Sequence, residues 1–233
     1  MKGKFEPAKV FVPTREKGSW DSWFTENEIL VYATLAQYSF AFYPINIEIT
    51  STLIATTIFQ TTGTPSSFQI KYVKKGLEEL YKRNPKWITF LDKSKNRLTI
   101  NSVDIREINK EKYSYAYVSY KEIYLIGKIY ERYKTENMAF YIKFMSTFDI
   151  KYGINHFTKE QLSKYMDMSI NTVKSRIQKL LEKKLLFAYH SPVIQNMNTF
   201  AGESNIYYLP GDFDKAEKYY KETRKKYFKT KGV

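Results

Sequence analysis

The side chains best suited to chemistry in this chain are short polar and cationic groups clustered between residues 169 and 179. The candidates are Ser169, Asn171, Thr172, Lys174, Ser175, Arg176 and Lys179. Hydroxyl and amide groups can hydrogen-bond to base edges in a major groove, while Lys and Arg bind the flanking phosphates. The cluster therefore predicts a DNA-contacting surface. The alternative is an ordinary amphipathic helix with a solvated charged face.

Local signals predict which elements carry this cluster. Thr158 and Gln161 have the spacing of a capping box, so a helix should begin there. Ser169 is a second N-cap candidate, and apolar positions follow it at steps of three and four. A hydrophobic strand should come next, and a second strand is expected at Ile206 to Leu209. The order is helix, tight turn, helix, strand, loop, strand.

The same order of elements is predicted earlier in the chain. Thr25 and Glu28 form another capping box, and Thr50 or Ser51 should cap a second helix. A third helix is expected over residues 68–82, with Phe68 on its apolar side, and a hairpin over 87–100. The candidate DNA contacts here are Gln69, Lys71, Tyr72, Lys74 and Lys75 on the helix, and Lys93, Lys95 and Arg97 in the hairpin.

Gly76 lies in the middle of that third helix, where glycine costs about 1 kcal/mol relative to alanine. It indicates either close packing of helices or a tight approach to DNA.

Both stretches resemble the winged helix-turn-helix family, in which a recognition helix is followed by a β-hairpin wing. The second is also similar to the amino-terminal domain of the RepA_N plasmid replication initiators of low-GC Gram-positive bacteria. The residues that match its motif are Phe157, Thr158, Glu160, Leu162, Ser169, Thr172, Leu180, Leu185, Leu186, Asn205, Ile206 and Tyr207. The resemblance implies DNA binding. The chain departs from that family because another winged unit precedes this domain and no long C-terminal domain follows.

The expected fold class is mainly α with small β-hairpin wings (α+β), built as two tandem winged-helix domains joined by a helical linker. The expected division has five parts. They are an N-terminal arm (1–23), a first winged-helix domain (24–104), a linker with a connecting helix (105–134), a second winged-helix domain (135–211) and a basic C-terminal helix or tail (212–233).

Composition narrows the function classes. A net charge of +14 and a pI near 9.5 favour a polyanionic partner, nucleic acid first and an acidic membrane surface second. There is no cysteine, and the histidines, His156 and His190, do not have the spacing of a zinc site. Without a phosphate-binding glycine loop either, we expect no enzyme activity, no cofactor and no metal. No signal peptide or membrane-spanning stretch is evident, so we expect a cytoplasmic protein at the nucleoid or a plasmid.

The expected partner is double-stranded DNA, with host replication or transcription proteins and a second copy of the chain as further candidates. Three roles stay open: a replication initiator at origin repeats, a transcription regulator of a plasmid, phage or conjugative-transfer operon, and a structural or segregation protein. A winged helix that binds a partner without DNA is also possible. The basic tail, with lysines and tyrosines interleaved from Lys218 to Lys231, fits a solvated helix, an arm along the DNA backbone or a membrane-surface helix.

Overall fold

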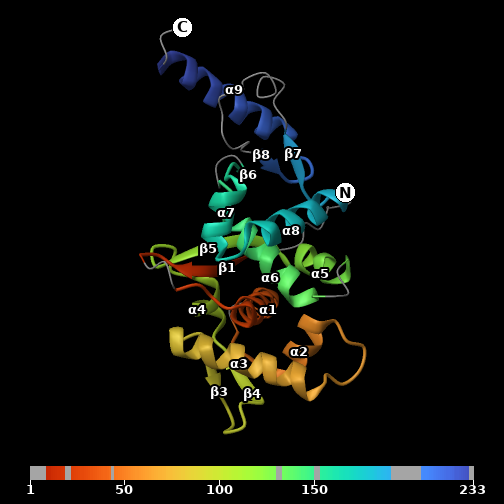
Figure 1. Cartoon of the computed structure of the whole chain (residues 1–233). Coiled ribbons are helices and arrows are strands. Elements are labelled where there is room, and N and C mark those ends of the chain that lie inside the picture. Colours follow the sequence, from red (N-terminus) through yellow and green to blue (C-terminus); the bar gives the residue numbers. More distant parts are fainter. Residues whose placement is uncertain are drawn as a thin grey trace, which may run out of the picture. The chain divides into compact units, whose positions relative to one another are not determined.

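The computed structural model describes residues 9–18, 22–42, 45–129, 133–149, 153–189 and 206–230, and only the backbone of residues 42 and 223–230. The described residues form an α+β fold in which helices predominate and the strands make small antiparallel sheets (Figure 1). The chain divides into two compact units, Met1–Ser146 (unit 1) and Thr147–Val233 (unit 2).

Unit 1 is organised around a central helix. Its elements are β1 (Lys9–Glu16), α1 (Glu26–Phe42), β2 (Ile47–Thr50), α2 (Ser51–Phe59), α3 (Ser67–Arg83), β3 (Ile88–Phe90), β4 (Arg97–Ile100), α4 (Ser102–Arg106), β5 (Tyr113–Ser119), α5 (Tyr120–Ile129) and α6 (Lys134–Met145).

Helix α1 is buried on several sides. Every residue from Ile29 to Ala36 is buried, including Thr34. The reason is that α2, α3, α4, α6 and β1 all pack on this helix. A helix that is apolar nearly all round belongs in the core. The capping box predicted at its start is confirmed, because Thr25 N donates to Glu28 Oε2 over 2.6 Å and Glu28 N to Thr25 Oγ1 over 3.4 Å.

The segments expected to be an arm (1–23) and a linker (105–134) contain paired strands instead. Strand β1 pairs antiparallel with β5, with Val10 opposite Val118 and Val12 opposite Ala116. These four side chains are buried. Helix α6, which we expected to open the second domain, packs on α1, α5 and β5 within unit 1. The residues expected to be an arm and a linker therefore help to build the first compact unit.

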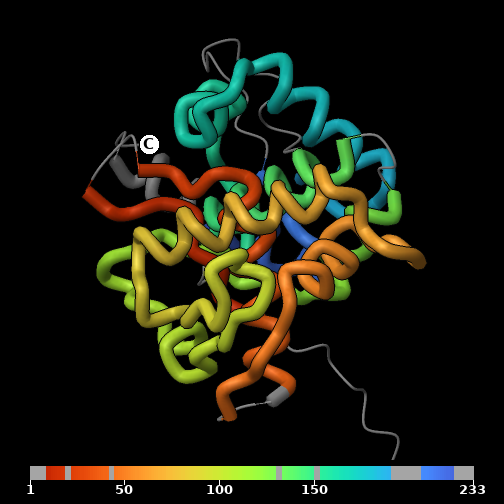
Figure 2. The backbone as a smooth tube through the Cα atoms, turned by 90° about the horizontal axis from the view of Figure 1, so that it is seen from below, coloured from red at the N-terminus to blue at the C-terminus, as the bar shows by residue number. Residues whose placement is uncertain are grey.

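The predicted helix–hairpin arrangement is present in unit 1. Thr50 caps α2, Ser66 and Gln69 form a capping box for α3, and β3 and β4 form the hairpin. Strand β2 pairs with the other edge of β4, so the sheet order is β2-β4-β3. Helix α3 is the gold helix at the front of Figure 2.

Unit 2 repeats this order of elements at a smaller size. Its elements are β6 (Ile154–Asn155), α7 (Lys159–Met166), α8 (Ile170–Glu182), β7 (Phe187–Tyr189), β8 (Ile206–Tyr208) and α9 (Phe213–Thr230). The sheet order is β6-β8-β7. In each three-stranded sheet the first strand in sequence pairs with the last, and two helices lie between the first and second strands.

The first half of the predicted basic C-terminal helix packs on the small sheet of unit 2. Ala216 of α9 is fully buried with Ile154 and Ile206, and four tyrosines surround this cluster: Tyr189, Tyr208, Tyr219 and Tyr220. Its basic side chains beyond Glu222 lie outside the described residues, as do His190 and Asn205.

Candidate nucleic-acid interface

Helix α8 is held in place by a tight turn after α7. The turn spans Asp167–Ser169, and Asp167 adopts a left-handed conformation with φ 51°. The Ser163 hydroxyl donates to Met168 O over 2.6 Å, which ties the turn back to α7. Both predicted caps are confirmed: Thr158 and Gln161 form a capping box, and Ser169 Oγ accepts from Thr172 N over 3.1 Å.

The core of unit 2 fixes the rotation of α8 about its axis. Val173, Ile177 and Leu180 are buried on one side of the helix, as expected from their spacing. Asn171, Lys174 and Ser175 are consequently exposed on the opposite side, together with Gln178 and Lys179. These positions are three and four residues apart, so they form one continuous stripe. The stripe offers amide, hydroxyl and ammonium groups to a ligand.

Three of the predicted α8 residues have structural partners. The Ser169 and Thr172 hydroxyls hydrogen-bond to each other over 2.8 Å, in addition to the N-cap bond. Arg176 is half-buried and its Nη1 lies 3.9 Å from Met168 Sδ. These three residues therefore stabilise the turn before α8 and the start of the helix.

Glu160 on α7 interacts electrostatically with Lys174 of the exposed stripe. The pKa of Glu160 is held below its usual value by hydrogen bonds from its own backbone N–H and the Thr158 hydroxyl, with a smaller contribution from Lys174. Glu160 is therefore an anion at neutral pH.

On α3, Lys71 and Lys75 are exposed one turn apart, and Lys74 is half-buried. The Gln69 side chain accepts from Ser66 N over 2.8 Å as part of the capping box, so this amide already has a structural partner. These positions offer point charges for phosphates more than groups for reading bases.

Tyr72 does not lie on the exposed side of α3 as we expected. Its hydroxyl donates to Glu26 Oε1 over 2.8 Å, and its ring packs edge-on against Phe59. Burial raises the pKa of Tyr72 above its ordinary value, and the neighbouring Glu26 carboxylate raises it further. Tyr72 joins α3 to α1 and α2 and is only partly exposed.

Phe68 was expected on the buried side of α3 and is instead 72% exposed. Helical spacing contains the signal that identifies this. Each residue advances about 100° around the axis, so a residue five positions before buried Val73 points away from the core. Phe68 therefore adds an apolar group to the exposed N-terminal end of α3, beside Ser67 and Lys71.

Two of the three predicted cations in the hairpin of unit 1 form ion pairs. Lys95 Nζ forms an ion pair with Glu78 Oε1 over 3.0 Å, and Arg97 pairs with Glu48. Asp92 shapes the turn by accepting from Asn96 N and Arg97 N, each over 2.9 Å. Lys93 is exposed in this turn.

The part of the chain that the structure describes contains no group of three His, Cys, Asp or Glu residues able to hold a metal ion. The His156 ring stacks on Tyr219 with centroids 5.5 Å apart. Among the described helices, none is long and apolar enough to cross a bilayer.

Comparison with known proteins adds no relative from which function could be transferred. The chain matches no protein-family model, no curated protein and no solved structure.

Proposed function

We propose that this protein binds double-stranded DNA sequence-specifically through two tandem winged-helix domains, with α8 as the main base-reading helix. The observation that carries the proposal is the exposed stripe Asn171, Lys174 and Ser175 on the N-terminal half of α8. Helix-turn-helix proteins place the N-terminal residues of their second helix against base edges in the major groove. Amide, hydroxyl and ammonium groups are the donors and acceptors that distinguish base pairs there.

The repeated arrangement of elements supports a tandem winged-helix fold. Both units place two helices between the first and second strands of a three-stranded antiparallel sheet. In unit 1, the β3–β4 hairpin follows α3 at the position of a wing. We propose that α3 enters a second groove through Lys71 and Lys75, and that Lys93 contacts the DNA backbone.

The two helices divide the work because their exposed groups differ. Ammonium groups on α3 would attract DNA phosphates. This attraction carries little information about the base sequence. The stripe on α8 combines an amide and a hydroxyl with ammonium groups. We therefore assign specificity mainly to unit 2 and general affinity mainly to unit 1.

Within this class, we propose replication initiation on a plasmid or another mobile element. The support is that motif residues between Phe157 and Tyr207 resemble the RepA_N pattern. Two of them, Thr158 and Ser169, are the N-caps of α7 and α8. The initiator would bind repeated sites at an origin in the cytoplasm.

Selection from a library of random duplexes with the full-length protein tests the proposal directly. We expect one motif to be enriched, and we expect Asn171→Ala to relax its sequence. If no motif is enriched, the sequence-specific function is wrong. The position of the enriched motif in the host replicon then separates the roles: repeats within an origin favour an initiator, whereas sites over a promoter favour a transcription regulator.

A further inference from the structure

The β1–β5 ribbon of unit 1 has an outer face that the DNA-binding proposal does not use. Val10 and Val12 are buried on the inner face, where α1 and α6 pack on the ribbon. Because side chains alternate along a strand, Phe11 must point to the opposite face. It lies opposite Tyr117 in the register, and Pro13 lies opposite Tyr115. The outer face is therefore aromatic.

The aromatic rings on this face form a contiguous platform. Phe11 and Tyr117 stack with centroids 4.7 Å apart and an interplanar angle of 29°. Phe11 also meets Tyr115 edge-to-face at 5.1 Å. The outer ring is accessible, since Tyr117 is 49% exposed. A flat ligand can extend this stack from the Tyr117 side.

Cations lie directly over the same rings. Lys110 Nζ is 4.1 Å from the Phe11 centroid, and Lys9 Nζ is 5.6 Å from the Tyr117 centroid. Both lysines are exposed, and each carries its ammonium group at the end of a flexible four-carbon chain. Glu16, an acidic residue on the same strand, is already paired with Arg83. The platform therefore combines ring faces with mobile positive charge.

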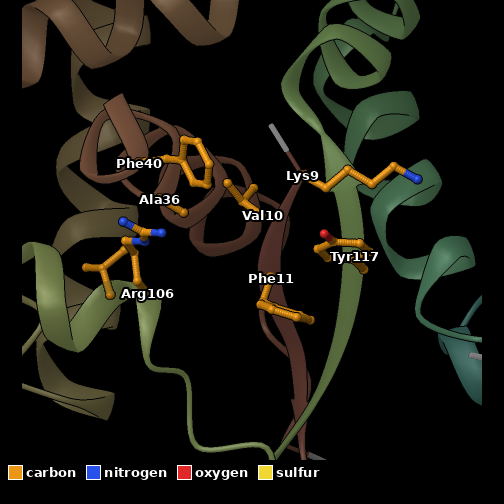
Figure 3. A pocket seen from close by; sticks show the side chains of 8 residues that line it. Lys9, Val10, Phe11, Ala36, Phe40, Arg106 and Tyr117 are labelled. Carbon is orange, nitrogen blue, oxygen red and sulfur yellow. The ribbon is translucent and has the colours of Figure 1, made fainter. Parts of the chain in front are cut away.

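A small cavity adjoins the platform at the edge of β1. It has a volume of about 210 Å³ and is lined by Lys9, Val10, Phe11, Ala36, Phe40, Ile105, Arg106 and Tyr117 (Figure 3). The Arg106 guanidinium lies 4.8 Å from the Phe40 centroid on the side opposite β1. Pockets for whole drug-sized ligands measure about 300–1,000 Å³, so this cavity suits a single ring system.

We infer that this face binds an unpaired DNA strand, with bases stacked on Tyr117 and at the cavity, and phosphates held by Lys9 and Lys110. Sequence-tolerant binding of single strands combines aromatic stacking with a cationic track. The phosphates of duplex DNA could bind the lysines, but its bases could not stack on the rings because they are already stacked on one another. An acidic peptide would likewise leave the platform without a partner.

The site is independent of α8 in its residues and its ligand. The stripe on α8 belongs to unit 2, whereas every platform and cavity residue belongs to unit 1. Single-strand binding can therefore fail while duplex recognition stands, and the reverse also holds.

Fluorescence anisotropy of the full-length protein with labelled oligothymidylate of about 12 nucleotides tests this inference. An abasic oligomer of the same length carries the same phosphates without bases. We expect the abasic oligomer to bind more weakly, and Tyr117→Ala to weaken oligothymidylate binding about 5- to 150-fold. Tyr117→Phe should retain binding. The matched control is Tyr124→Ala, which removes another exposed tyrosine of the same unit, on α5. This variant should leave affinity unchanged.

A second readout locates the bound base. An oligomer carrying 5-iododeoxyuridine should cross-link on irradiation to the peptide that contains Tyr117, and the cross-link should disappear in Tyr117→Ala. Equal affinity for the abasic and normal oligomers would overturn the stacking site. Tighter binding of oligouridylate than of oligothymidylate would overturn its assignment to DNA.

Discussion

Arg83 at the end of α3 donates through Nε to Glu28 Oε1, near the start of α1, over 2.5 Å. The same guanidinium donates to Trp23 O over 2.8 Å and lies 4.2 Å from the Phe24 ring centroid. The Glu28 side chain is only 2% exposed and also accepts from Thr25 in the α1 capping box. Arg83 therefore ties the candidate DNA-binding helix of unit 1 to the cap of the central helix.

Replacing Arg83 should destabilise the protein substantially. Arg83→Met would leave Glu28 as a buried carboxylate without its cation, and removing one partner of a buried pair costs about 3–5 kcal/mol. Chemical denaturation followed by circular dichroism measures the loss. Lys82→Met is the matched control, because its ion pair with Glu79 is exposed. Equal denaturation midpoints for the two variants would contradict the structural role of Arg83.

Gly76→Ala should also destabilise unit 1, although alanine favours helices by about 1 kcal/mol. A Cβ at this position would lie 2.8 Å from Asn27 O and 2.9 Å from Val31 Cγ2 of α1. Overpacking of this kind costs about 1–3 kcal/mol, so the net effect should be a lower melting temperature. Gly63→Ala, with no atom within 4 Å of the new Cβ, should show no such loss. Of the two explanations for the mid-helix glycine, close packing is the one that this geometry supports.

Lys174→Ala should weaken binding to the selected DNA motif by about 1–3 kcal/mol if the ammonium contacts a base. Its affinity for random duplexes should fall much less, because specific and general binding use different contacts. Competition gel shifts with specific and random duplexes measure the difference. Lys128→Ala on α5 serves as the control for loss of one exposed positive charge. Unchanged specific binding by Lys174→Ala would show that α8 does not read bases through this residue.

Lys93→Ala should weaken binding to specific and random duplexes alike. A phosphate contact contributes counterion release, so its loss should reduce the slope of log K against log salt concentration by about 0.9. Titrations at several salt concentrations give the slope. If the slope of Lys93→Ala equals that of the parent protein, the β3–β4 hairpin does not contact the DNA backbone through Lys93.

Alkaline pH should destabilise the protein through buried tyrosines. Burial raises the pKa of Tyr32 and Tyr72 in the folded state, whereas an unfolded tyrosine titrates near pH 10. Above that pH the unfolded state binds fewer protons than the folded state, so stability present below about pH 10 is lost as pH rises. Urea midpoints of the parent and Tyr72→Phe should differ at pH 8 and converge above pH 10. A constant difference would contradict this linkage.

The caps and helical periods in the sequence determined most of the local structure. Capping pairs such as Thr158 with Gln161 act within one turn, so their residue types and spacing are sufficient evidence for a helix start. The stripe on α8 was likewise readable, because burial of Val173 and Ile177 places Asn171, Lys174 and Ser175 on the opposite side.

Only the tertiary structure decided which segments pair across long distances and where each candidate side chain points. The partners in the β1–β5 ribbon, such as Phe11 and Tyr117, are about a hundred residues apart, and no local pattern encodes that register. Tyr72 occurs among lysines in the sequence, yet its hydroxyl binds Glu26 because α1 passes beside α3. Local spacing specifies the elements and their faces, whereas long-range packing determines which faces remain available for a ligand.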